Sequence, residues 1–288
     1  MKIRHIILLS ASALLASGCT SAISFKPTNN NQIVDSKAFL NQLDFLFASN
    51  PLFLGAESPI AYSYEMEVVM NTTEETSYKS PFSEELLYKK ETKSESKAIA
   101  KYDSVNCILS QSGDGKSTTT TPEEKTVTTT KNNYLLQSGS DAAYTLNLLK
   151  NVYSVYKTEN ALEYIQQYAI SGIKTYVSLI EKLADEDNTT CYVGSNVYTV
   201  SMQNQTTSES IASSETGKAQ LVVEENSFTI NIEEKLAKTT FSTMHEYYNM
   251  TGTGQIKVTR KAVTLSRKDM SKMAEEKTSY DQNGYLVK

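Results

Sequence analysis

The reactive side chains of this chain are few, and their spacing completes no common catalytic motif. Outside the first 18 residues, His245 is the only histidine, whereas a zinc site needs three or four ligands. Ser154 and Lys157 fit a Ser-x-x-Lys nucleophile pattern, but no Lys-Thr-Gly motif accompanies it. Gly115-Lys116-Ser117 matches the end of a phosphate-binding loop, but Ser110 stands where that loop requires glycine. We therefore expect a protein that is not an enzyme and holds no metal ion or cofactor.

The acidic side chains are numerous but are not arranged for catalysis. Adjacent carboxylates occur at Glu123-Glu124, Glu224-Glu225 and Glu233-Glu234. Neighbouring residues of a strand point to opposite faces, so such pairs cannot converge on one substrate. The run Asp185-Glu186-Asp187 lacks the spaced oxygen ligands of a calcium loop. We expect the pairs to lie on a solvated surface and the run to end a helix.

Two cysteines, Cys107 and Cys191, remain beyond the N-terminal segment, and they are too far apart for a Cys-x-x-Cys redox or metal motif. An exported protein could join them in a disulfide. Two buried free thiols are the alternative, because the sequence does not give the geometry that a bridge needs.

The first 19 residues have the order of an export signal. Lys2 and Arg4 are positive, Ile6–Leu15 is an apolar run, and the small residues Ala16–Gly18 precede Cys19. The apolar run is too short for a stable membrane span, so it is typical of a secretory signal peptide.

The segment Leu14–Cys19 resembles the lipobox of bacterial lipoproteins, although Ala16 stands where that family usually has leucine. The resemblance implies that residues 1–18 are a removed signal peptide. It also implies that Cys19 carries a thioether-linked diacylglyceryl group, with acyl chains such as palmitate. Two acyl chains hold a protein durably on a bilayer, so we expect a lipid-anchored protein on the extracytoplasmic face of the cell membrane. The alternative is ordinary cleavage near Gly18, which would leave a free cysteine. The resemblance ends there, and no specific family is identified for the mature domain.

The anchor is followed by a polar segment, residues 19–35, which contains Pro27 and a run of asparagines. We expect a flexible tether that reaches about 50 Å when fully extended. Residues 36–288 then form one strand-rich domain, which the sequence also allows to be two halves flanking a long helix.

Apolar residues at spacings of three and four predict two helices. The first is residues 37–48, and the second, residues 158–184, is capped by Thr158 and is roughly 40 Å long. A third, short helix is expected at residues 268–276.

The remaining segments are predicted to be strands. Tyr62–Val68 alternates large apolar and polar residues, which is the period of a half-buried strand. Turns are expected at Ser112–Gly115 and Thr251–Gly254, and a long loop at residues 203–218. The expected fold class is α+β, with antiparallel curved sheet and one long helix. Whether the two strand-rich parts are a duplication or one large sheet is left open.

The net charge and the apolar residues of the chain indicate which classes of partner it could bind. The formal charge is −5 and becomes −7 without Lys2 and Arg4, so no nucleic acid partner is expected. The apolar strand faces suggest a binding or carrier protein for an apolar or lipid-like ligand, an architecture that broadly resembles the half-barrels of bacterial lipoprotein and lipid carriers. The alternative is a structural, adhesin-like surface protein with a filled core. The expected ligand-binding residues are Tyr62, Tyr64, Met66 and Tyr247.

Overall fold

A computed structural model describes residues 23–28, 31–53, 62–83, 85–276, 279–280 and 286–287. The predicted signal peptide and Cys19 lie outside the described residues, so the lipobox interpretation stays a prediction.

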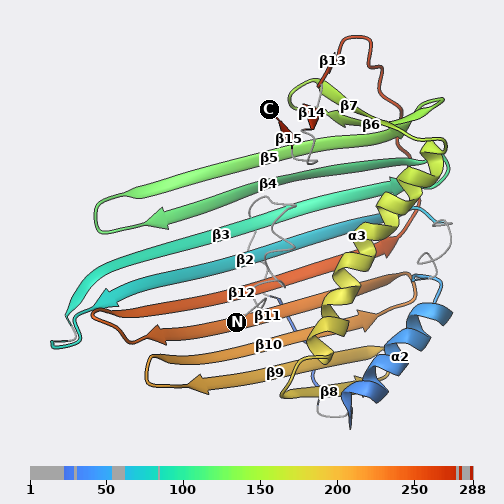
Figure 1. Cartoon of the computed structure of the whole chain (residues 1–288). Helices are drawn as coiled ribbons and strands as arrows, with labels where there is room; N and C mark the ends of the chain where they lie inside the picture. The colour runs from blue at the N-terminus through green and yellow to red at the C-terminus, as the bar shows by residue number, and fades with distance from the viewer. Residues whose placement is uncertain are drawn as a thin grey trace.

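The described chain is dominated by one sheet of thirteen strands, which is antiparallel except for the parallel pairing of β13 with β7 (Figure 1). The α+β class expected from the sequence is therefore wrong: the architecture is a single large sheet, with two helices on one face. The strands are β1 (Gln32–Val34), β2 (Tyr64–Lys79), β3 (Leu86–Asp103), β4 (Ile108–Thr120), β5 (Lys125–Ser138), β6 (Ala142–Asn147), β7 (Val152–Lys157), β8 (Thr189–Gly194), β9 (Val197–Thr207), β10 (Ile211–Val223), β11 (Ser227–Thr240), β12 (His245–Arg260) and β13 (Ala274–Glu275). The pair β14 (Ser279–Tyr280) and β15 (Leu286–Val287) is separate.

Most neighbours in the sheet are also neighbours in sequence, and the order is β1-β8-β9-β10-β11-β12-β2-β3-β4-β5-β6-β7-β13. The central exception is the long ladder between β12 and β2, in which Ile256 lies opposite Val68. This ladder joins the two strand-rich halves of the chain into one sheet.

Helices α2 (Ser36–Ser49) and α3 (Ala161–Ala184) cover one face, which we call the helix face. They overlap the two long helices expected from the sequence. The α3 cap is Asn160 rather than Thr158, because the Asn160 side chain accepts a hydrogen bond from the Glu163 amide at 3.1 Å. Its apolar stripe is buried against the sheet, and Figure 1 shows it crossing most of the strands.

The opposite face, which we call the outer face, is covered in part by two chain segments without regular structure. Residues 23–28 lie over β10 and β11, as described below. Residues 261–273 run from Ser63, which accepts from the Lys261 amide at 3.2 Å, past the end of β3 to β5. There the Gln137 side chain accepts from the Lys268 amide at 2.8 Å and donates to the Lys268 carbonyl at 3.0 Å. Here Leu265, Met270 and Met273 pack on a second apolar cluster. The short helix expected at residues 268–276 is thus wrong, because this segment is irregular, makes one turn in which the Met273 amide donates to the Met270 carbonyl at 2.9 Å, and then forms β13.

Two turns expected from glycine-containing segments are also wrong. Ser112–Gly115 lies inside β4, and Thr251–Gly254 lies inside β12. A β-carbon at Gly254 would collide with the Met70 side chain, and one at Gly113 would lie 3.0 Å from the Lys97 carbonyl oxygen. These glycines allow close packing across the sheet. The loop expected at residues 203–218 is mostly the β9–β10 ladder, with only a short connection at 208–210.

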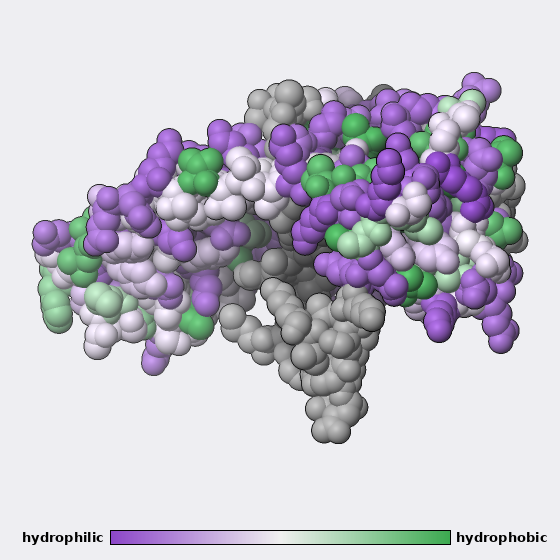
Figure 2. All heavy atoms as spheres, turned by 90° about the horizontal axis from the view of Figure 1, so that it is seen from above, coloured by the Kyte–Doolittle hydropathy of each residue, from purple (hydrophilic) through white to green (hydrophobic). Residues whose placement is uncertain are grey.

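The long strands continue well past the helices, to the left in Figure 1. In Figure 2, which shows the molecule from above, this distal half is largely hydrophilic, with a few hydrophobic residues near its end. Threonine-rich β5 illustrates this, since residues 125–131 are all exposed. The main apolar core therefore lies only under α2 and α3.

The stability of the fold should depend on the buried stripe of α3. Replacing fully buried Ile180 by alanine should lower the free energy of unfolding by about 2–5 kcal/mol, because it leaves a cavity against the sheet. Replacing Leu162, which is 49% exposed on the same helix, should change it by about 0.5 kcal/mol or less. Urea unfolding of both variants measures the difference, and equal losses would contradict this account of the core.

Candidate functional site

The chain forms an apolar pocket beside α3 on the helix face of the sheet. Its volume is about 230 Å³, larger than an engineered apolar cavity of about 150 Å³ that binds benzene. The lining residues are Phe47, Leu52, Phe53, Tyr62, Ile170, Ile173, Lys174, Val177, Ser178 and Glu181.

One wall of the pocket is a single stripe of α3. Ile170, Ile173 and Val177 recur at helical spacing and are each less than a tenth exposed. The polar side chains of Lys174, Ser178 and Glu181 line the pocket beside this stripe, because each follows another lining residue by four positions. This wall therefore offers apolar contact along with a few polar groups.

The opposite wall comes from the end of α2 and the residues that follow it. The rings of Phe47 and Phe53 lie 4.9 Å apart, and Phe53 in turn lies 4.7 Å from Phe228 of the sheet. This chain of aromatic contacts fixes the wall to the main core. Aromatic rings supply a large apolar surface at well-defined positions.

Tyr62 closes the pocket near the start of β2. Its hydroxyl donates a hydrogen bond to the Leu52 carbonyl, which fixes the position of the ring. Residues 54–61, between these two residues, lie outside the described part of the chain. The Arg260 guanidinium lies 5.3 Å from the centre of the ring. Burial raises the pKa of Tyr62 to about 12, with Arg260 opposing the shift, so this side chain is a neutral hydrogen-bond donor at physiological pH.

The charged groups of the pocket belong to α3. Burial raises the pKa of Glu181, Asp44 on α2 adds to the shift, and Lys182 opposes it. A partly buried carboxyl beside an apolar wall can select the polar end of a ligand, and Lys174 and Ser178 add two further polar groups to this wall.

The structure brings only one of the four predicted ligand-binding residues to this pocket, namely Tyr62. Tyr64 lies under α3, where it is 1% exposed and donates to the Ala169 carbonyl at 3.0 Å. Met66 is likewise buried under α3 near Gly172. Tyr247 lies at the distal end, with the Lys79 ammonium 4.9 Å from its ring centre.

Sequence reasoning missed the other lining residues. The α3 residues of the lining could not be identified from the sequence, because a pocket wall and a core face share the same spacing. Leu52 and Phe53 follow the Asn50-Pro51 helix stop and carry no pattern that could have identified them.

The chemically reactive residues do not gather at this pocket. Cys107 and Cys191 are both buried free thiols rather than a disulfide. His245 opens β12 and packs edge-on against Phe241, with ring centres 5.3 Å apart. Within the part of the chain that the structure describes, no group of three or more histidine, cysteine or acidic side chains could hold a metal ion. Of the helices in that part, none is long and apolar enough to cross a membrane.

A buried carboxyl lies on the helix face near the C-terminal end of α3. Glu233 and Glu234 point to opposite faces as predicted, and Glu233 pairs with Lys235 at 2.5 Å. Glu234, however, is only 4% exposed and one of its oxygens has no hydrogen-bond partner. The expectation of a solvated surface is therefore wrong for Glu234. Burial raises its pKa to about 7, and the neighbouring Glu215 adds to the shift.

Glu234 should make the stability of the protein depend on pH. Its pKa rises from the ordinary value of 4.5 to about 7 on folding, so the folded state binds more protons between these values. The free energy of unfolding should then fall by about 3 kcal/mol as the pH rises from 4.5 to 7. Glu234→Gln should remove this contribution, and the matched Glu233→Gln should keep it. Urea unfolding across this pH range measures the effect, and an undiminished fall in Glu234→Gln would contradict it.

Comparisons with known proteins do not assign this chain to a family. No protein-family model matches the chain, and no curated protein matches it. Among solved structures, the chain is similar to the translocator domain of the autotransporter NalP from Neisseria meningitidis. The sequence identity is 7%, 76% of this chain and 96% of that chain are covered, and the TM-score is 0.16. A likeness of that size supports no inference about fold or function, so both are argued from the residues of this chain.

Proposed function

We propose that this protein is an exported, lipid-anchored binding protein that holds an apolar or lipid-like ligand in the pocket between α2 and α3. The observation that carries the proposal is the pocket itself: an apolar cavity of about 230 Å³ beside Tyr62. Small-molecule sites are typically concave and mostly apolar, with a few polar groups that fix the orientation of the ligand.

The lining favours binding over catalysis. Among the described residues, those that line the pocket include no histidine or cysteine, and the hydroxyl of Tyr62 donates to the Leu52 carbonyl. The polar groups on α3 are suited to orienting the polar end of a ligand whose apolar part fills the cavity. A short acyl chain or a compact apolar molecule has this character.

The anchor is the second part of the proposal and rests on the lipobox-like sequence Leu14–Cys19. A Cys19→Ser variant expressed in a bacterium should lose incorporation of labelled palmitate and leave the membrane fraction, because it lacks the acceptor sulfur. Wild-type protein that takes up no palmitate would contradict the anchor while leaving the pocket untouched.

A second candidate is a surface interaction protein, and one observation favours it. Large apolar side chains are exposed where the β2–β3 and β11–β12 hairpins end. Phe82 is 97% exposed, and Leu86 and Leu87 are about half exposed. Phe241 and Met244 of the adjacent hairpin are 39% and 48% exposed. Exposed apolar patches often mark contact sites for partners.

The pocket should bind an uncharged apolar fluorophore, N-phenyl-1-naphthylamine, with a gain in fluorescence. Val177→Trp should weaken this binding about tenfold or more, because the indole fills the space between α3 and Phe53. The control Val127→Trp places the same ring at an exposed position of β5 and should bind as the wild type does.

Thermal unfolding of both variants checks that they remain folded. Equal binding by the wild type and Val177→Trp would contradict a ligand site at this pocket. Binding that is lost instead when Phe82 is replaced by serine would favour the second candidate.

A further inference from the structure

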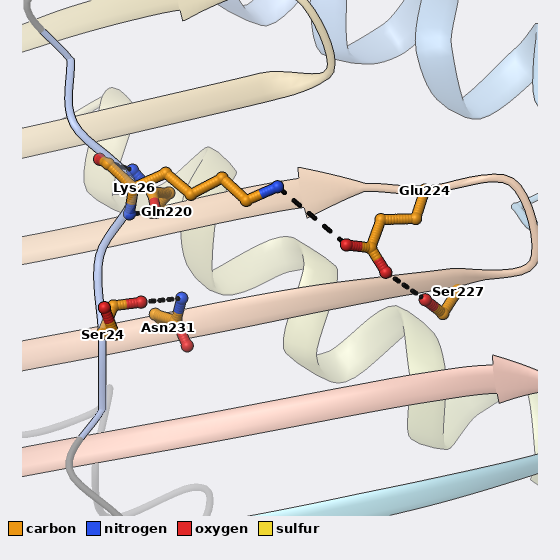
Figure 3. Close-up of polar contacts among 6 residues, drawn as sticks. All are labelled: Ser24, Lys26, Gln220, Glu224, Ser227 and Asn231. Atoms are coloured by element: carbon orange, nitrogen blue, oxygen red, sulfur yellow. Dashed lines mark hydrogen bonds and ion pairs between the residues drawn. The ribbon is translucent and has the colours of Figure 1, made fainter.

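The segment that directly follows the anchor position is bound to the outer face of the sheet. Residues 23–28 cross β11 and β10 without pairing as a strand (Figure 3). We call this segment the strap. It belongs to the stretch that the sequence predicted to be a flexible tether, and its contacts with the sheet were not anticipated.

The strap is held by the side chain of Gln220, which is fully buried beneath it. The Lys26 amide donates to Gln220 Oε1 at 2.7 Å, and Gln220 Nε2 donates to the Lys26 carbonyl at 2.9 Å. The same Nε2 donates to Thr199 Oγ1 at 3.0 Å, which fixes the amide in place. A buried amide that satisfies a backbone donor and acceptor together leaves unpaired polar groups if it is removed.

Further contacts extend the attachment on both sides of Gln220. Asn231 Nδ2 donates to the Ser24 carbonyl at 3.2 Å, and Lys26 pairs with Glu224 at 3.9 Å (Figure 3). The Lys218 ammonium lies 4.5 Å from the centre of the Phe25 ring. The strap is thus attached through its backbone, an ion pair and a ring contact.

The bound strap shortens the reach of the anchor. Only four peptide steps separate Ile23, the first residue of the strap, from Cys19, so the two α-carbons lie at most about 14 Å apart. A tether free up to residue 35 would allow about 50 Å.

The position of the strap determines which surface this short reach brings to the membrane. Asn231 is four residues from one end of β11 and nine from the other, which is roughly 13 Å and 30 Å along the strand. The sheet edge at β1 lies four strands away, roughly 19 Å. The near end of β11 lies at the limit of the anchor's reach, and the far end and the β1 edge lie beyond it, so the outer face around the strap is the surface that the anchor holds closest to the membrane.

We infer that the outer face of β9–β12 lies against the anchoring membrane, and that the pocket between α2 and α3 opens away from it. The inference rests on the lipid at Cys19 that the proposed function includes. It adds that the ligand is exchanged with the space beyond the anchoring bilayer, because the sheet stands between the pocket and that bilayer.

Charge on the outer face is compatible with a lipid surface. On the strands that the strap crosses, Glu233 of β11 pairs with Lys235 at 2.5 Å, and Glu224 beside β10 pairs with Lys26 of the strap at 3.9 Å. Acidic side chains here are matched by lysines, so the face presents no block of negative charge to repel anionic headgroups.

Spin labels on the two faces of the lipidated protein test the orientation. The protein is purified with its own lipid, in a Cys107→Ser, Cys191→Ser background, and placed in phosphatidylcholine vesicles that contain a gadolinium-chelating lipid. Labels are attached through Lys257→Cys on the outer face or Thr175→Cys on α3, both exposed positions. Relaxation should be enhanced several-fold more at position 257. Equal enhancement, or more at position 175, would overturn the inference.

Two glutamine variants test the role of the strap. Gln220→Leu should reduce the difference between the two labels and increase amide exchange in residues 23–28, because the strap loses its clamp. Gln203→Leu, on the outer face of β9 and exposed, should retain both properties of the wild type. A label difference unchanged by Gln220→Leu would overturn the role of the strap. A wild-type protein that does not fractionate with vesicles would instead contradict the lipid anchor itself.

Discussion

Both faces of one wide sheet must be shielded where its apolar residues lie, and the rest of the structure depends on this constraint. The helix face is covered by α3, whose stripe crosses the strands, and by α2 beside it. The outer face is covered by the strap and by the segment 261–273. Buried Gln220 and Gln137 each bind one residue of the covering segment through both its amide and its carbonyl. In both segments, which do not pair as strands, the side-chain amide of a glutamine thus satisfies a backbone N–H and a backbone C=O group.

The pocket follows from the way in which two helices share one face. Leu52 and Phe53 after α2 and Tyr62 before β2 form one side of the pocket, and the apolar stripe of α3 at Ile170–Val177 forms another. Because Phe53 packs on Phe228 and Tyr62 on Tyr64, these walls are fixed by the core. The site that we propose for a ligand is therefore a gap between elements that pack on the main core.

The periodicity of apolar residues predicted individual helices and strands, but it did not predict which strands pair with each other. The spacing of apolar residues placed two helices, and the alternation in Tyr62–Val68 placed a strand. The ladder between β12 and β2 joins residues that are far apart in sequence, and no periodicity reports such a pairing. Gly113 and Gly254 suggested turns but serve close packing, since turn glycines and packing glycines look alike in a single sequence. Of the residues that line the pocket, Tyr62 was among those expected to bind a ligand. The α3 residues of the lining could not be distinguished in the sequence from residues that pack in the core.

Native mass spectrometry of the protein, gently purified from its host, tests the central claim of a ligand-binding pocket most directly. The account predicts a bound apolar molecule of defined mass that is lost on denaturation and is absent from a variant whose pocket is filled. A clean apo mass for the wild-type protein, together with no uptake when the protein is incubated with extracted host lipids, would contradict it.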